Sequence, residues 1–120
     1  MVRNFEDLII WQDARTLANQ VHYSFIESRD FSFRDQINRA AVSVMNNIAE
    51  GFERNNNKEF VVFLKYSKGS AGEIRSMLYV ALDLNYISKS TFDEYYTNVI
   101  KIITQISNFM KYLKNYSGKK

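Results

Sequence analysis

The sequence predicts an all-α protein, an antiparallel up-down-up-down four-helix bundle that forms a single domain over residues 1–120. Three observations lead to this prediction. The chain contains no proline and only four glycines, so long helices can run without interruption. Apolar residues make up 46% of the chain and charged residues 24%, as in ordinary globular proteins. Four stretches repeat apolar residues at three- and four-residue steps with short polar breaks between them, which is typical of such a bundle.

The first two predicted helices each carry one apolar face. The first covers about residues 6–28, and its seam consists of Leu8, Trp11, Ala14, Ala18, Val21 and Phe25. The second covers about residues 33–54, with Ser32 as its expected N-cap. Its seam consists of Phe33, Ile37, Ala41, Val44, Ile48 and Phe52. Both seams indicate helices that pack one side against a core.

The other two helices follow the same period. The third covers about residues 58–84 after a capping asparagine run at residues 55–57, and the fourth covers about residues 90–115 with Ser90 as its expected N-cap. The main row of the fourth helix is Phe92, Tyr96, Val99, Ile103, Ile106, Met110 and Leu113, and a second row is Tyr95, Ile102, Phe109 and Tyr116. Two rows make an apolar stripe wider than one partner helix needs, so we expect contacts beyond one core.

The residue types exclude most catalytic chemistry. Cysteine is absent, which excludes disulfides, thiolate metal sites and cysteine nucleophiles. A carboxylate–histidine metal site in a bundle needs Glu-x-x-His pairs, but His22 is the one histidine and Asn19 stands three residues before it. No glycine-rich phosphate-binding motif is present. We therefore predict no catalytic residues, no metal, no cofactor, no small-molecule substrate and no enzymatic activity.

The N-terminal sequence predicts neither a signal peptide nor a membrane span. The apolar run near the start is short and acids precede it, and charges recur along the whole chain. We expect a cytoplasmic protein. A chain of this length buries a modest core, so association with copies of itself is a natural source of further stability.

Positive charge is concentrated at the C-terminal end. The net charge is +3, yet residues 95–120 contain five lysines and no acid. The candidate nucleic-acid contacts are Lys111, Lys114, Lys119 and Lys120, and the tyrosines at 112 and 116 lie among them as possible stacking partners for bases. The alternative is a solubilising end whose lysines complement the helix dipole.

The second helix carries a narrow polar track on a mostly apolar surface. Its residues are Gln36, Arg39, Ser43, Asn47, Glu50 and Arg54. Two favourable i,i+4 ion pairs are expected along the helix, Asp35 with Arg39 and Glu50 with Arg54. The track is either a solvent-facing strip or a specific polar contact with another helix or another subunit, and the asparagine and serine, which are poor helix formers, favour contact.

The third helix contains Gly69 and Gly72 in its interior, where each costs about 1 kcal/mol relative to alanine. Both project away from the apolar seam of the third helix, which includes Phe60 and Ile74. The glycines are either a tolerated weak spot or kink, or a place where another backbone approaches the outer face of the helix. The second interpretation accounts for the cost and predicts a subunit contact.

Four segments together resemble the family of bacterial four-helix bundle proteins named for the 23S rRNA intervening sequence, also labelled the S23 ribosomal protein family. The segments are LIIWQDARTLANQVH, QINRAAVSVMNNIAEGFER, EFVVFLKYSKGSAGE and LDLNYIS, which span about residues 5–90 in order. The resemblance implies a bundle that assembles into a ring-shaped homopentamer and is not an enzyme.

The resemblance also selects candidate residues. The polar residues that match the family pattern are Arg39, Asn47, Glu50, Arg54, Ser70 and Glu73. With Ser43 and Gly69 they form the candidate interface or polar network. We expect an oligomeric interaction or scaffold protein, with rRNA or a ribonucleoprotein as partner. The alternative is a direct nucleic-acid-binding accessory protein, similar to the variability accessory protein of retroelements, and a cryptic enzyme is a third, weaker hypothesis.

Overall fold

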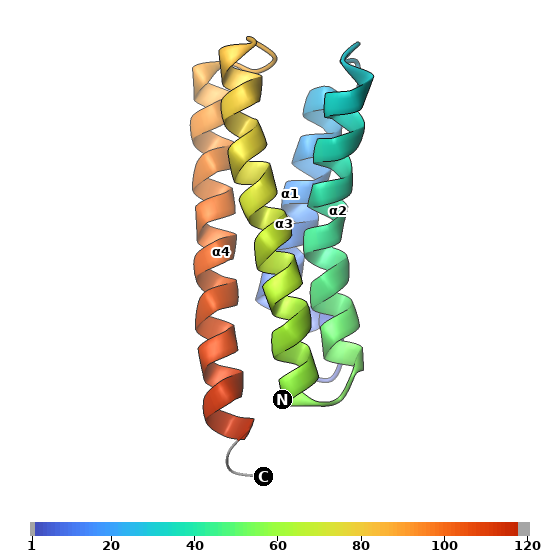
Figure 1. Ribbon diagram of the computed structural model, residues 1–120, viewed down its shortest axis with the longest axis vertical. Helices are drawn as coiled ribbons and strands as arrows, with labels where there is room; N and C mark the ends of the chain where they lie inside the picture. Colours follow the sequence, from blue (N-terminus) through green and yellow to red (C-terminus); the bar gives the residue numbers. More distant parts are fainter. Residues whose placement is uncertain (1, 118–120) are drawn as a thin grey trace.

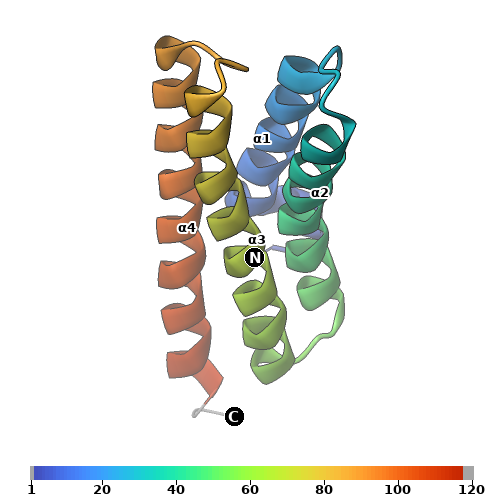
Figure 2. The ribbon, with the colours of Figure 1, turned by 45° about the horizontal axis from the view of Figure 1, so that its top comes forward.

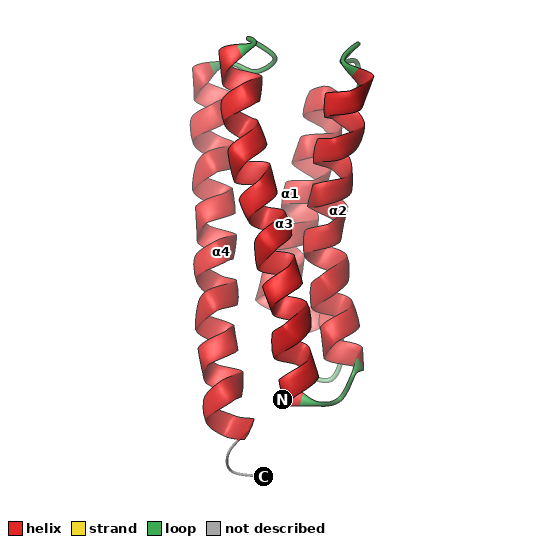
Figure 3. Ribbon diagram, viewed as in Figure 1, coloured by secondary structure: helices red, strands yellow, loops and turns green. Residues whose placement is uncertain are grey.

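The computed structural model describes residues 2–117, which form a four-helix bundle. The helices are α1 (Ile9–Phe25), α2 (Phe31–Glu53), α3 (Asn57–Asp83) and α4 (Lys89–Ser117), and a short 3-10 helix, η1 (Phe5–Asp7), precedes α1. Successive helices alternate in direction, and all elements of the described part are helical (Figures 1 and 3). The predicted up-down-up-down bundle is therefore confirmed.

Each helix packs against its neighbours in the chain, and α1 also meets α4 to close the bundle. The pairing of α1 with α2 and of α3 with α4 is visible from two directions (Figures 1 and 2). The largest fully buried side chains come from all four helices: Leu17, Val21, Phe25, Ile37, Val44, Ile48, Leu64, Ile74, Leu78, Val99, Ile102 and Ile106. The apolar seams predicted for the first three helices supply most of this core, because a 3.6-residue period places those positions on one face.

The predicted main row of the fourth helix is mostly buried, at Phe92, Val99, Ile106, Met110 and Leu113, but it is not the whole of the inward face. Tyr95 and Ile102, from the expected second row, are buried. Tyr96 and Ile103, from the expected main row, are only partly buried and flank the core. The inward face therefore alternates between the two rows as far as Ile106 and then follows the main row, since an α-helix drifts by about 20° per heptad against a strict seven-residue repeat.

The first helix is shorter than predicted at both ends. We expected residues 6–28, but the backbone at Leu8 is extended, with φ −75° and ψ 128°, and separates η1 from α1. At 1.5 Å per residue, the 17 residues of α1 make it about 18 Å shorter than the 29 residues of α4. The last turns of α4 therefore extend beyond the start of α1.

Two predicted N-caps are wrong and one is confirmed. α2 is capped by Asp30 rather than Ser32, because the Phe33 N–H donates to Asp30 Oδ1 at 3.1 Å. At the start of α4, Ser88 accepts from the Thr91 N–H at 3.1 Å, two residues before the expected Ser90. The asparagine run caps α3 as expected, and Asn56 Oδ1 accepts from the Glu59 N–H at 3.0 Å. Across residues 2–117, no helix is long and apolar enough to cross a membrane.

A hydrogen bond between loops ties the α1–α2 connection to the α3–α4 connection. Tyr86 Oη donates to Asp30 Oδ2 at 2.6 Å. This bond, together with the Phe33 N–H, lowers the pKa of Asp30 below its ordinary 3.8, and the same bond raises the pKa of Tyr86 above 10.0. Because the pKa of the carboxyl is lowered, the hydrogen bond stabilises the fold above the pKa of the unfolded state, and this stabilisation is lost on acidification. Because the pKa of the phenol is raised, the bond also stabilises the fold below pH 10, and this stabilisation is lost above it.

We expect Tyr86→Phe to lower the thermal unfolding midpoint by a constant amount between about pH 5 and 9. The difference from the wild type should shrink below about pH 4, where Asp30 becomes protonated in the unfolded chain, and again above about pH 10, where Tyr86 ionises in the unfolded chain. Circular dichroism melts across this range test the prediction. Tyr23→Phe, an exposed tyrosine on α1, is the matched control and should change little at any pH. A Tyr86→Phe difference that is the same at pH 3 and pH 7 would contradict it.

Candidate functional site

The polar track of α2 lies along its junction with α3. At mid-height, Ser43 Oγ and Ser70 Oγ are 2.8 Å apart and share a hydrogen bond between the two helices. Asn47 Nδ2 donates to both the backbone oxygen and Oγ of Ser43, each at 2.9 Å. All three side chains are half-buried, so the bonds are shielded from water on one side. This centre of the predicted network is brought together within one chain.

The two ends of the track are more exposed. Gln36 Nε2 donates to Glu73 Oε2 at 3.1 Å. At the other end, Arg54 lies 3.2 Å from Glu50 and 3.8 Å from Glu59, and its guanidinium lies 4.8 Å from the ring centre of Phe63. Exposed ion pairs of this kind contribute little to stability, at most about 1 kcal/mol each. They orient α2 against α3 without leaving these side chains free for a ligand.

Arg39 has a different environment from the rest of the track. It is exposed and has no partner within residues 2–117, because Asp35 pairs with Arg34 at 3.3 Å in place of the expected i,i+4 partner. It lines a shallow hollow of about 540 Å³ on the exposed, outer side of α2, together with Asn38, Val42 and Asn46 and with the track residues Ser43, Asn47 and Glu50. This outer face is the part of α2 that remains available to another molecule.

The glycines of α2 and α3 have opposite environments. A Cβ at Gly69 or Gly72 would meet no atom within 4 Å, so both face open space, and α3 continues through them without a break. A Cβ at Gly51 would lie 2.7 Å from Phe60 Cδ1 and 2.8 Å from Phe63 Cβ. Gly51 therefore allows α3 to approach α2. No role was predicted for Gly51, although it lies three residues after buried Ile48 on the core face.

The outer face of α3 carries a row of residues at alternating four- and three-residue steps: Val62, Tyr66, Gly69, Glu73, Ser76 and Val80. Val62, Tyr66 and Val80 are 41%, 57% and 43% exposed. Spacing of this kind is what a helix uses to meet a partner helix, yet the row points away from the core. We call these six residues the α3 outer row.

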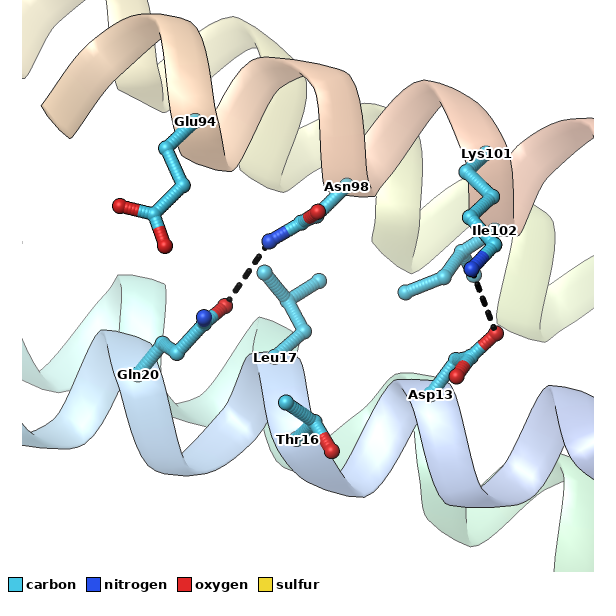
Figure 4. A pocket seen from close by; sticks show the side chains of 8 residues that line it. All are labelled: Asp13, Thr16, Leu17, Gln20, Glu94, Asn98, Lys101 and Ile102. Atoms are coloured by element: carbon cyan, nitrogen blue, oxygen red, sulfur yellow. Dashed lines mark hydrogen bonds and ion pairs between the residues drawn. The ribbon is translucent and has the colours of Figure 1, made fainter. Parts of the chain in front are cut away.

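The junction of α1 with α4 is polar and contains a hollow of about 330 Å³ (Figure 4). Asn98 Nδ2 donates to Gln20 Oε1 at 3.1 Å, and Lys101 Nζ lies 3.6 Å from Asp13 Oδ2. That distance is an ion pair but too long for a hydrogen bond, so this buried carboxylate oxygen has no hydrogen-bond donor. The sequence analysis selected none of these residues, because they belong to polar faces that only the packing brings together.

The described residues hold no site with recognisable catalytic or metal-binding chemistry. His22 is exposed and lies edge-on to Tyr23, with ring centres 5.6 Å apart. Nowhere in residues 2–117 do three histidine, cysteine, aspartate or glutamate side chains come together around one point. What the geometry offers is a set of surfaces for contact.

One such surface lies at the bundle end, where the N-terminal segment, the α2–α3 loop and the end of α4 meet. A pocket of about 790 Å³ there is lined by Val2, Leu8, Phe52, Asn55, Asn56, Asn57, Phe60, Phe109, Tyr112 and Leu113. We call it the end pocket. The Phe109 and Tyr112 rings are nearly parallel, with centres 6.0 Å apart, and Tyr116 continues the series at 4.6 Å. Lys111 and Lys114 are exposed on the same turns, whereas Lys119 and Lys120 lie outside the described residues.

The sequence model of the 23S rRNA-intervening sequence protein family matches residues 6–108. The chain belongs to this family. No match is found among curated proteins. The bundle is similar to a crystal structure from Bacteroides thetaiotaomicron of a protein of unknown function from the S23 ribosomal protein family, with a TM-score of 0.78 and 19% identity over 86% of this chain and 99% of that one. At that identity the similarity shows the fold alone. This fold is the four-helix bundle of the 23S rRNA-intervening sequence protein family.

Proposed function

We propose that this member of the 23S rRNA-intervening sequence protein family is a non-enzymatic scaffold that assembles into homo-oligomers. A pentameric ring is the form that the family resemblance favours. Its partner in this proposal is rRNA or a ribonucleoprotein in the cytoplasm, in keeping with the family's name. The observation that carries the proposal is the open space around Gly69, on the α3 outer row, and around Gly72 beside it.

The two glycines weaken α3 without improving any contact inside the chain. Each costs about 1 kcal/mol relative to alanine in a helix interior. Since no atom lies within 4 Å of either missing Cβ, packing within one subunit does not require glycine there. Close approach of a helix from another subunit does require it, and the exposed side chains of Val62 and Tyr66 continue the same surface.

Assembly is tested by light scattering and sedimentation of the full chain at micromolar concentration. We expect a defined oligomer for the wild type, and a monomer there would refute the proposal. Gly69→Lys should raise the helix propensity of α3 and leave the monomer folded, yet it should disperse the oligomer because a long charged side chain would occupy the contact. Thr104→Lys, on the exposed side of α4, is the matched control and should leave the assembly intact.

Arg54→Glu is a less selective test of the same interface. Arg54 contacts Glu50, Glu59 and the Phe63 ring within one chain, so its reversal would introduce repulsion inside the subunit as well. A loss of assembly in this variant would not distinguish a subunit contact from a disturbed α2–α3 junction. Gly69 has no such contacts, and its replacement reports on the outer face alone.

A further inference from the structure

The end pocket combines the exposed ring of Tyr112 with hydrogen-bonding amides. Tyr112 is 52% exposed on one wall, and the ring of Phe109 lies nearly parallel to it at an interplanar angle of 13°. Asn55, Asn56 and Asn57 also line the pocket. Aromatic rings stack on nucleobases of any sequence, and amide side chains donate to and accept from the edges of bases.

The chemistry of Asn55 and Tyr112 suits a ligand whose planar base is neutral and whose backbone is anionic. Asn55 adopts a left-handed conformation, with φ 55°, at the turn between α2 and α3 and beside the capping Asn56. A hydrogen bond with Tyr116 raises the pKa of Tyr112, so its ring carries no charge near neutral pH. The pocket also adjoins the first turn of α3, and helix amino ends favour anions.

Positive charge surrounds the end pocket. The cationic residues next in sequence to its lining residues are Arg3, Arg54, Lys58, Lys111 and Lys114, and the acidic ones are Asp7, Glu53 and Glu59. Glu59 lies 3.8 Å from Arg54, which partly neutralises it. No acidic residue occurs in α4 after Glu94. The balance of charge around the rings therefore suits a polyanion.

The fold explains why these groups remain uncovered. α1 begins at Ile9 and leaves Tyr112 on the last turns of α4 exposed, whereas Phe109 packs edge-on against Phe60 of α3 with ring centres 5.3 Å apart. Figure 1 shows the N-terminal segment, the α2–α3 loop and the last turns of α4 at the same end of the bundle. A long groove is not required, because one or two bases are enough to occupy an aromatic surface of this kind.

We propose that the end pocket binds single-stranded nucleic acid, with a base stacked against Tyr112 and its phosphates beside the surrounding cations. This site is separate from the α3 outer row, so binding does not depend on the proposed assembly. The nature of the contacts predicts little sequence preference and a strong dependence on salt. Tyr112 supplies the stacking surface, and Lys111 and Lys114 supply part of the phosphate attraction.

Fluorescence anisotropy with short labelled oligouridylate and oligoadenylate, at about 50 mM and about 200 mM salt, tests this site on the full chain. We expect binding at the lower salt that weakens steeply at the higher. Tyr112→Ala should weaken it about tenfold and Tyr112→Phe should retain most of it, because stacking needs the ring and not the hydroxyl. Lys111→Gln and Lys114→Gln should each reduce the slope of log affinity against log salt concentration by about one, the amount expected for the loss of one phosphate contact.

Tyr23→Ala is the matched control, since Tyr23 is 74% exposed on α1 and lies outside the end pocket. It should leave the affinity unchanged. Absence of binding at low salt, or equal losses in Tyr112→Ala and Tyr23→Ala, would overturn the proposal. A Tyr112→Ala variant that keeps its affinity for oligonucleotides but changes the oligomer size in light scattering would also overturn it, and would assign Tyr112 to a protein contact instead.

Discussion

Replacement of Gly51 by alanine is expected to lower the free energy of unfolding by about 2 kcal/mol, although alanine is the better helix former. The added Cβ would lie 2.8 Å from Phe63 Cβ and 2.7 Å from Phe60 Cδ1. The Phe60 ring has some freedom to move, but the Cβ of Phe63 is held by the backbone of α3. The two helices would therefore have to separate locally, and this cost exceeds the gain in helix propensity of about 1 kcal/mol.

Gly69→Ala is the matched control for Gly51→Ala, and its expected effect has the opposite sign. A Cβ at Gly69 meets no atom within 4 Å, so the monomer should gain about 1 kcal/mol. Both variants are to be compared with the wild type by urea unfolding, at a concentration where light scattering shows monomers, because assembly would add to the apparent stability. If Gly51→Ala unfolds at the same urea concentration as the wild type or a higher one, the close approach of α2 and α3 is not as described.

Ile102→Ala is expected to lower the free energy of unfolding by about 3 kcal/mol, and Ile103→Ala by about 1 kcal/mol or less. The two residues are adjacent and chemically identical, so they differ only in position. Ile102 is 1% exposed and lies within the core, whereas Ile103 is partly buried at its edge. Truncation of Ile102 removes buried methyl groups and leaves a cavity, whereas the space left by Ile103 is open to solvent.

Chemical denaturation of the Ile102→Ala and Ile103→Ala variants, followed by circular dichroism, tests this pair directly. A loss for Ile103→Ala that is larger than the loss for Ile102→Ala would show that Ile103, from the row expected from the sequence, faces inward in place of Ile102. Light scattering on Ile103→Ala adds a second result. If that variant keeps its stability but loses its oligomeric state, the edge of α4 takes part in the subunit contact as well.

The predicted polar track shows where reasoning from the sequence reached its limit. Helical periodicity placed Ser43, Asn47 and Arg54 on one stripe of α2, and the structure has them there. It did not indicate what that stripe faces. The stripe faces α3, where Ser43 contacts Ser70 and Arg54 lies near Glu59 on the first turn. These contacts depend on how the two helices are rotated about their axes. Periodicity within one helix carries no information on that rotation.

The same limit applies to the helix ends and to the end pocket. Asn56 was recognisable as a cap. Asp30 and Ser88 act as caps because of the conformations of the loops that contain them, and each lies two residues from the predicted cap. The aromatic and basic residues at the end of α4 were visible in the sequence. Asn55 and Val2 lie far from Tyr112 along the chain, and only the folding of three segments toward one end brings them into the same pocket.

The sequence by itself determined that the chain is helical, that it forms four helices of bundle length, and which residue types are missing for catalysis. These properties follow from local period, from the absence of proline and from composition, which need no knowledge of neighbouring helices. The tertiary structure decided that Gly51 is required and Gly69 is not, and that Ile102 rather than Ile103 faces the core. The physical reason is that each depends on the distance and rotation between helices, which packing alone sets.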